Sequence, residues 1–214
     1  MSRSDLSAAW AELLRSLGAA DRRAVAHAFD EVSARYSEPH RRYHTLEHVA
    51  EVLGYLEDLW SPAPPPPGLC LAAWLHDVVY DPRRADNEAA SAAWATGRLG
   101  ALGVADDVGR EAHRLIELTA GHDPSDDDEP GRVLADADLA ILGAPGDRYD
   151  RYAAAVREEY GFVPDEDYRA GRSRVLHGFL ERSAIYHTDR ARAAFEAAAR
   201  GNLARELAAL SGDA

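Results

Sequence analysis

The sequence predicts an all-α fold, and three observations support this prediction. Apolar residues recur at helical spacing between turn signals, as Val25, Phe29, Val32 and Tyr36 do. Alanine, the best helix former, is frequent in segments such as residues 86–102. The alternation of apolar and polar residues that half-buried strands need is hard to find along the chain. We therefore expect a bundle of helices.

The expected helices of the N-terminal half are bounded by N-cap residues and by proline. They span residues 21–36, 45–60, about 69–80, 86–102 and 106–120. Asp21 and Thr45 are residue types that cap helix N-termini. Asp86 and Asn87 would cap the fourth of these helices in the same way. Residues 61–68, SPAPPPPG, form a rigid extended connector that we expect not to be helical.

The expected helices of the C-terminal half follow an acidic loop. They span residues 132–143, 146–160, 165–182 and 189–210. The loop, residues 121–131, is bounded by glycine and proline, and Gly143 ends the first of these helices. No internal repeat is visible, and the proline-rich connector reads as a loop between helices. We therefore expect residues 1–214 to form a single domain.

Composition limits the possible partners and the compartment. The formal net charge of −13 argues against a nucleic-acid polymer or an anionic membrane as partner, although local arginines could still bind a small anion. Cys70 is the only cysteine, which favours a reducing cytoplasm. We find no signal-peptide pattern and no apolar run of the roughly 18 residues that a membrane span needs. The sequence leaves the oligomeric state open.

The segment AAWLHDVVYDP, residues 72–82, raises a question of charge. Asp77 lies in an apolar run, where burying its carboxylate would cost several kcal/mol without a compensating partner. All 24 Lys+Arg residues are arginine, so no lysine can neutralise it. Either a distant arginine folds back onto Asp77, or a metal cation binds there.

Metal-capable side chains occur inside or beside apolar helices at three places. These pairs are His44 with His48, His76 with Asp77, and Asp136 with Asp138. His48 also stands three residues after Thr45, where a capping box would have Glu or Gln, which indicates another task. Imidazole and carboxylate ligands suit Zn, Mn, Fe, Co or Ni, and the sequence does not choose among them.

The order His48, His76-Asp77, Asp138 resembles the H…HD…D signature of the HD-domain metal-dependent phosphohydrolase superfamily, an all-helical fold. The segments RRYHTLEH, LHDVVYDPRRADNEAASA, DADLAILG and YRAGRSRVLHGFL are similar to the subfamily described as predicted HD-superfamily phosphohydrolases. This similarity covers most of residues 38–210. It implies one HD-type helical domain, with a metal-binding core of about 38–145 on which C-terminal helices of about 146–210 pack.

The resemblance also implies a ligand set for one metal. The implied ligands are His48, His76, Asp77 and Asp138. Two positions stay open, because His44 could replace His48 and Asp136 could replace Asp138. We prefer His48 because it lies inside its expected helix, and Asp138 for the last ligand.

Hydrolysis of a phosphate ester needs further side chains beside the metal. Arginine forks suit the phosphoryl oxygens, and the candidates are Arg41, Arg42 and Arg172. His44 and His122 are further candidates for substrate contact, the latter if the acidic loop folds over the pocket. A carboxylate near the metal but not bound to it would act as general acid or base, and Glu88 and Asp81 are the candidates.

These expectations amount to a cytoplasmic metal-dependent phosphohydrolase with one divalent transition metal. It would act on a small phosphorylated metabolite or nucleotide through a metal-activated water. No Gly-rich phosphate loop, serine elbow or CxxC pair points to another chemistry. The alternatives are an HD-fold di-iron oxygenase and a non-catalytic metal- or ligand-binding protein. The oxygenase would need extra histidines between Asp77 and Asp138, where only His113 and His122 lie.

Overall fold

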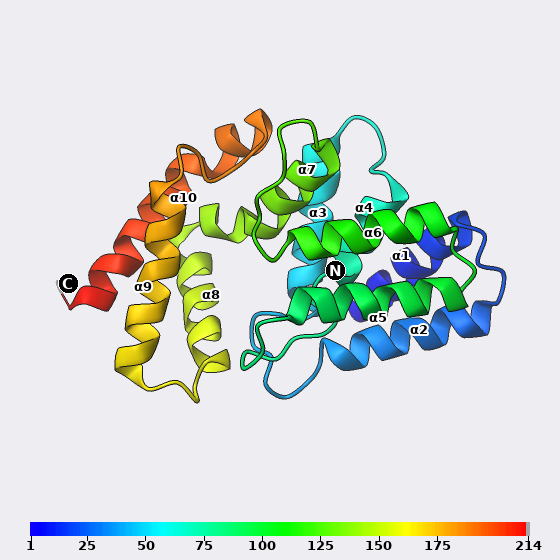
Figure 1. Ribbon diagram of the computed structural model, residues 1–214, viewed down its shortest axis with the longest axis horizontal. Coiled ribbons are helices and arrows are strands. Elements are labelled where there is room, and N and C mark those ends of the chain that lie inside the picture. Colours follow the sequence, from blue (N-terminus) through cyan, green and yellow to red (C-terminus); the bar gives the residue numbers. More distant parts are fainter. Residues whose placement is uncertain (213–214) are drawn as a thin grey trace.

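The computed structural model describes residues 1–212, which form helices joined by turns and contain no strand (Figure 1). The all-α prediction is therefore confirmed. In chain order the helices are α1 (Arg3–Ser16), α2 (Arg22–Arg35), α3 (Leu46–Trp60), α4 (Pro67–Leu75), α5 (Asn87–Ala101), α6 (Asp106–Leu118), α7 (Glu129–Asp138), the short 3₁₀ helix η1 (Leu139–Gly143), α8 (Gly146–Glu159), α9 (Asp165–Glu181) and α10 (Asp189–Ser211).

Most expected helices agree with the structure to within two residues at each end. The helix expected over 132–143 instead begins at Glu129, inside the expected acidic loop, and is divided into α7 and the 3₁₀ helix η1. The other differences concern α4 and α1. Helix α4 begins at Pro67, so the expectation that residues 61–68 contain no helix is wrong for the last two. Proline is favoured at the first helical position, because it lacks an N–H that would have no partner there. Helix α4 also ends at Leu75, which places His76 and Asp77 in the turn after it. Helix α1 was not among the expected segments.

Side-chain caps explain where α2 and α3 begin, but not where α5 begins. The Asp21 carboxylate accepts the backbone N–H groups of residues 23 and 24, and the Thr45 hydroxyl accepts that of residue 47, as expected. Asp86 occupies the cap position of α5, but its carboxylate pairs with Arg84 and caps nothing. The Asn87 side chain instead bonds to the main chain of Asp81, so the expected Asp86–Asn87 cap is wrong.

Two hydrophobic clusters make up the interior. The first cluster is built from residues of all the helices from α1 through α7. In it, the rings of Trp10 and Trp74 meet edge to face at 5.4 Å. The second joins η1 to α8, α9 and α10, which form a separate group of helices in Figure 1. Tyr43, from the turn before α3, belongs to the second cluster, and Leu59 of α3 contacts both. Residues that precede and begin α3 therefore lie where the clusters meet.

Helix α10 and the segment before it are fixed to η1 and the residue after it by buried polar contacts. The Asn202 side chain donates to the carbonyls of Leu142 and Ala144, at 2.9 and 2.8 Å. The Tyr186 hydroxyl, before α10, donates to the Leu139 carbonyl at 3.0 Å. These bonds satisfy carbonyls that the irregular end of η1 leaves unpaired. Across residues 1–212, the helices are too short or too polar for any of them to traverse a bilayer.

Candidate metal centre

Two buried histidines and a carboxylate, from α3, the turn after α4 and the end of α7, have their side chains close together. His48 lies in the first turn of α3 and His76 follows α4, and their Nε2 atoms are 3.2 Å apart. Asp138, the last residue of α7, places Oδ1 3.0 Å from Nε2 of His48 and 3.5 Å from Nε2 of His76. The ligand atoms of these three residues could hold one metal ion.

Asp77 lies beside this group. Its Oδ2 is 3.2 Å from Nε2 of His76 and 3.8 Å from Nε2 of His48. Metal bonds of about 2.0–2.2 Å put neighbouring ligand atoms about 3–3.5 Å apart. The separations among His48, His76 and Asp138 and between Asp77 and His76 fall in this range, whereas the 3.8 Å between Asp77 and His48 is wider. Buried imidazole nitrogen and carboxylate oxygen are also the donor types that divalent transition metals take. The residues present therefore fit the predicted metal.

The position of His76 fixes which of its nitrogens faces the centre. Its Nδ1 lies 3.1 Å from the carbonyl of Ala73, one turn back in α4. A carbonyl only accepts, so Nδ1 carries the proton and Nε2 is left to face His48 and Asp138. Such a bond on the second nitrogen is typical of histidines that bind metals.

The carboxylates of Asp136 and Asp138 face in different directions, because residues two apart in a helix project from nearly opposite sides. Asp136 is completely buried and accepts the backbone N–H groups of His187 and Thr188, each at 2.7 Å. It joins α7 to the start of α10. Asp138, the preferred choice from the sequence, is the one that faces His48.

Opposite charges stabilise one another within the cluster: protonated His76 favours the ionised carboxylates of Asp77 and Asp138, and these carboxylates favour protonated His76. Burial would raise the pKa of Asp77 and of Asp138, but the charge of His76 and hydrogen bonds from histidine hold both below the ordinary value. Burial likewise opposes the charged form of His76, but Asp77 and Asp138 raise its pKa well above the usual value. A bound cation would take the place of these protons.

Arg41 is the arginine that folds back onto the turn formed by His76 and Asp77. It binds main-chain carbonyls there and not the Asp77 carboxylate. Its side chain is fully buried, and Nη1 donates to the carbonyls of Asp77 and His44 at 2.8 and 3.1 Å. Nη2 donates to the Val78 carbonyl at 3.3 Å, and Nε pairs with Glu38. Arg41, predicted to contact phosphate, thus holds the turn that carries Asp77.

The two other predicted arginines have different surroundings. Arg172 in α9 is nearly buried and pairs with Glu206 of α10, at 2.8 Å from Nε. Arg42 is half exposed and pairs with Glu158 at 3.1 Å. A hollow of about 240 Å³ opens beside Arg42. It is lined by Arg42, Tyr43, Thr45, Glu47, His48, Arg148, Arg151 and Ala155.

The predicted acid–base carboxylates lie in the segment that leads into α5. The Asp81 carboxylate accepts the backbone N–H of Arg83, and the Asp81 carbonyl accepts the side-chain NH₂ of Asn87. These are the contacts of a turn residue. Glu88 is half-buried in the first turn of α5, and its charge adds to burial and to the charge of Glu159 in raising the pKa of Tyr160. Within residues 1–212, neither carboxylate is hydrogen-bonded to His48, His76 or Asp138.

The acidic loop does bring His122 to the centre. Its Nε2 lies 2.7 Å from Oδ2 of Asp138, the oxygen that does not face His48. The backbone of His122 has φ 48°, a left-handed conformation that few residues other than glycine adopt. Its carbonyl is 3.1 Å from Nε2 of His187, which helps to hold the loop. His113 instead lies at the surface with Thr96.

One residue of the site escaped the sequence predictions. Glu159, the last residue of α8, is 4% exposed and receives the backbone N–H groups of Arg42, Tyr43 and His44 at Oε1. Its Oε2 lies 2.7 Å from Nδ1 of His44 and 2.9 Å from the Tyr80 hydroxyl. His44 therefore faces Glu159 and lies outside the metal-capable group. Nothing in the sequence around Glu159 distinguishes it from Glu158.

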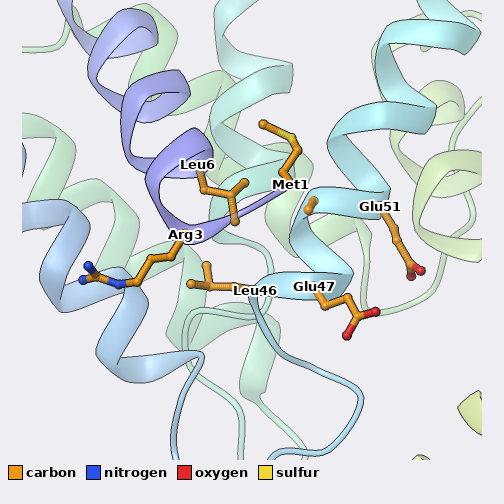
Figure 2. Close-up of a pocket in the computed structure, with 7 residues that line it drawn as sticks. Met1, Arg3, Leu6, Leu46, Glu47 and Glu51 are labelled. Carbon is orange, nitrogen blue, oxygen red and sulfur yellow. The ribbon is translucent and has the colours of Figure 1, made fainter.

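A second hollow, of about 480 Å³, lies between the start of α1 and the first turns of α3 (Figure 2). Leu6 and Leu46 face each other across it, while Arg3 and the carboxylates of Glu47 and Glu51 point away to either side (Figure 2). None of its lining residues is a histidine. This hollow therefore carries no chemistry related to the metal-capable group.

Comparison with known proteins adds no relative to this description. No family model, curated protein or solved structure matches the chain. The class that fold and site define is thus an all-α protein with a buried histidine–aspartate group that could hold a metal ion.

Proposed function

We propose that this chain is an HD-type metal-dependent phosphohydrolase acting on a small phosphorylated metabolite or nucleotide. One observation carries the proposal. His48, His76 and Asp138, with Asp77 beside them, converge from three separate helices and follow the H…HD…D order of that superfamily. Besides the two buried histidines, two carboxylates that are mostly shielded from solvent lie within 4 Å of them, which an apolar interior would disfavour without a cation or a proton to balance their charge.

In this proposal each residue has a defined task. His48, His76, Asp77 and Asp138 would hold one divalent transition metal (Mn, Co, Zn, Fe or Ni). Such a metal, when bound, lowers the pKa of a water and polarises a phosphoryl oxygen. His122 orients Asp138 through its second oxygen.

The hollow beside His48 supplies positive charge for an anionic substrate. Arg42, Arg148 and Arg151 line it, and each pairs with a carboxylate at 2.7–3.1 Å. The Arg42 and Arg151 pairs are solvent-exposed, and exposed pairs contribute only about 0–1 kcal/mol, so a phosphate dianion can compete for these guanidiniums. The net charge of −13 supports a small substrate in place of a nucleic-acid polymer, and the single cysteine supports a cytoplasmic location.

A second candidate function is a di-iron oxygenase of the same fold. The observation that favours it is His122, a histidine between Asp77 and Asp138 that reaches the centre. A second iron would need further ligands there, and His113 is held at the surface by Thr96 and Glu117. We therefore rank this candidate below the hydrolase.

The test combines metal analysis with a panel of phosphate esters and anhydrides assayed across Mn, Co, Zn, Fe and Ni. We expect hydrolysis that chelation removes and one of these cations restores. His76→Ala should abolish it, whereas His113→Ala, a matched change at the surface, should not. Absence of hydrolysis with every cation would contradict the proposal. Two irons per chain with O₂ consumption would establish the oxygenase instead.

A further inference from the structure

Glu159 and His44 form a buried pair that the metal group does not use. The two oxygens of Glu159 have separate partners: Oε1 receives three backbone N–H groups of residues 42–44, and Oε2 receives His44 and Tyr80. No part of the Glu159 side chain is exposed, whereas 22% of the His44 side chain is. Glu159 is therefore the buried, fixed member of the pair, and His44 is the member that solvent reaches.

The geometry fixes the state of the His44 ring. A carboxylate only accepts hydrogen bonds, so Nδ1 carries a proton and donates it to Oε2 over 2.7 Å. The ring is stacked on Tyr80, with centroids 4.1 Å apart and planes at 27°, and Tyr43 meets it edge-on at 5.0 Å. The ring therefore cannot rotate freely, and its Nε2 is the atom left for another partner.

His44 also lies beside the metal-capable group. Its ring centroid is 6.0 Å from that of His48.

We infer that His44 is the acid that protonates the leaving oxygen of the substrate, and that Glu159 is its positioning residue. This inference rests on the proposed hydrolase function. The bond between phosphorus and the leaving oxygen breaks as the charged His44 ring, which carries a proton on each nitrogen, gives the Nε2 proton to that oxygen and keeps the Nδ1 proton on Glu159. The oxygen of a water forms the new bond to phosphorus. The proton that this water loses passes to solvent, and solvent returns one to His44, so the net reaction consumes one water.

This assignment gives His44 the role that the sequence favoured for Glu88 or Asp81. An alkoxide is a poor leaving group, and a positioned acid accelerates its departure by about 10²–10⁴-fold. His44 suits this role because its second nitrogen is held by a carboxylate, as in other histidines that transfer protons. Glu88 and Asp81 have no comparable orientation.

Two substitutions separate the role of this pair from a merely structural one. In Glu159→Gln the amide oxygen must stay at Oε1, because three N–H groups point there. The NH₂ group then faces Nδ1 of His44, which must accept, so the neutral ring is forced into its other tautomer. His44→Asn keeps an amide donor for Glu159 but removes Nε2. Glu166→Gln, the same change at an exposed residue of α9, is the control.

The assay compares turnover of an alkyl phosphate with that of p-nitrophenyl phosphate, whose leaving group needs no acid. Both variants should lose about 10²-fold or more on the alkyl ester and less than about 10-fold on the nitrophenyl ester, with metal content unchanged. Ring ¹⁵N shifts should show Nδ1 of His44 protonated in the parent protein in both the charged and the neutral ring, whereas the neutral ring of Glu159→Gln should carry its proton on Nε2. The control should match the parent protein.

Equal losses on both esters would overturn the inference and leave the pair a structural role, while the hydrolase proposal would stand. Absence of hydrolysis by the metal-loaded parent protein would overturn both. If Glu159→Gln does not fold, His44→Asn tests the inference by the same comparison of the loss on the alkyl ester with the loss on the nitrophenyl ester. An Nδ1 without a proton in the parent protein would also overturn the inference.

Discussion

At the scale of single residues, hydrogen bonds on Nδ1 determine which histidine nitrogens are presented. His76 donates to a carbonyl of its own helix, and His44 donates to Glu159, a residue far along the chain. Both rings are thereby set before any ligand arrives, which reduces the entropy that binding must overcome. His122 differs, because it contacts Asp138 directly through Nε2.

Removing the His122 ring should separate metal binding from turnover. His122→Ala takes away a contact to Oδ2 of Asp138 but leaves Oδ1 facing His48. We expect the variant to keep its metal and to lose about 10- to 100-fold in turnover, the range found for residues that orient ligands. Elemental analysis and steady-state kinetics on the same preparation check this. Loss of the metal would place His122 among the ligands.

The Glu159 carboxylate should make the free energy of unfolding depend on pH. Burial raises its pKa, but His44 and the backbone N–H groups outweigh this and lower it from 4.5 to about 2. At about 1.4 kcal/mol per pKa unit, this corresponds to at most roughly 3 kcal/mol of stability. A lowered pKa stabilises above the unfolded value, so this contribution is full above about pH 5 and is lost as the pH falls toward 2.

Denaturant unfolding of the parent protein and Glu159→Gln at several pH values checks this. The variant should be less stable at pH 7 by up to about 3 kcal/mol, and the difference should shrink between pH 5 and 2. Glu158→Gln, which is exposed, should show little difference at any pH. A difference for Glu159→Gln that does not change with pH would contradict the account.

At the scale of elements, much of the fold follows from local rules. Helical spacing and caps such as Asp21 and Thr45 predict most helices to within two residues. The resemblance to the H…HD…D signature predicts the members of the metal-capable group. Local signals do not predict that His76 and Asp138 lie at helix ends, because the helices expected over 69–80 and 132–143 extend past both residues. Where local signals compete, as between Arg84 and the N–H groups of α5 for the Asp86 carboxylate, the prediction is wrong.

The parts that the sequence does not predict depend on contacts between distant segments. Glu159 bonds to His44 over 115 residues, and no periodicity of either segment encodes that approach. The position of Arg41 in RRYHTLEH predicts a contact with phosphate, but its guanidinium is buried and donates to main-chain carbonyls. His122 reaches Asp138 only because its loop adopts a left-handed turn. Sequence spacing identifies candidates here but not their neighbours.

The start of α3 should be sensitive to its cap, because His48 lies in the first turn. Thr45→Ala removes the hydroxyl that accepts the backbone N–H of Glu47. We expect a loss of about 1 kcal/mol, with a melting temperature lower by about 2–4 °C. Thr45→Ser, which keeps the acceptor, should stay close to the parent protein. Equal losses in both variants would show that the methyl group, and not the cap, matters.

At the scale of the whole molecule, the candidate centre lies where the two hydrophobic clusters meet. Arg148 of α8 pairs with Glu51 of α3 at 2.7 Å, and Glu159 of α8 binds the loop before α3. The C-terminal helices thus hold the segment that carries His44 and His48. The ligands themselves come from α3, α4 and α7, so a bound ion would bridge helices far apart in sequence.

Metal should therefore stabilise the folded chain as a whole. Binding to the folded state alone adds about 2.7 kcal/mol at 100 times the dissociation constant, or a rise of about 5–10 °C in melting temperature for a domain of this size. Thermal unfolding after chelation, and again after adding Mn²⁺ or Co²⁺, measures it. The rise should vanish in His76→Ala and persist in His113→Ala. A rise of the same size in both variants would assign it to metal bound elsewhere.

The most direct test of the metal centre is the metal-to-chain ratio of gently purified protein, measured by elemental analysis alongside His76→Ala, Asp138→Ala and the surface control His113→Ala. The account predicts about one transition metal per chain in the parent protein and the control, and almost none in the other two. Full occupancy in both His76→Ala and Asp138→Ala, or no metal in a parent protein supplied with Mn²⁺, Co²⁺, Zn²⁺, Fe²⁺ or Ni²⁺, would contradict it.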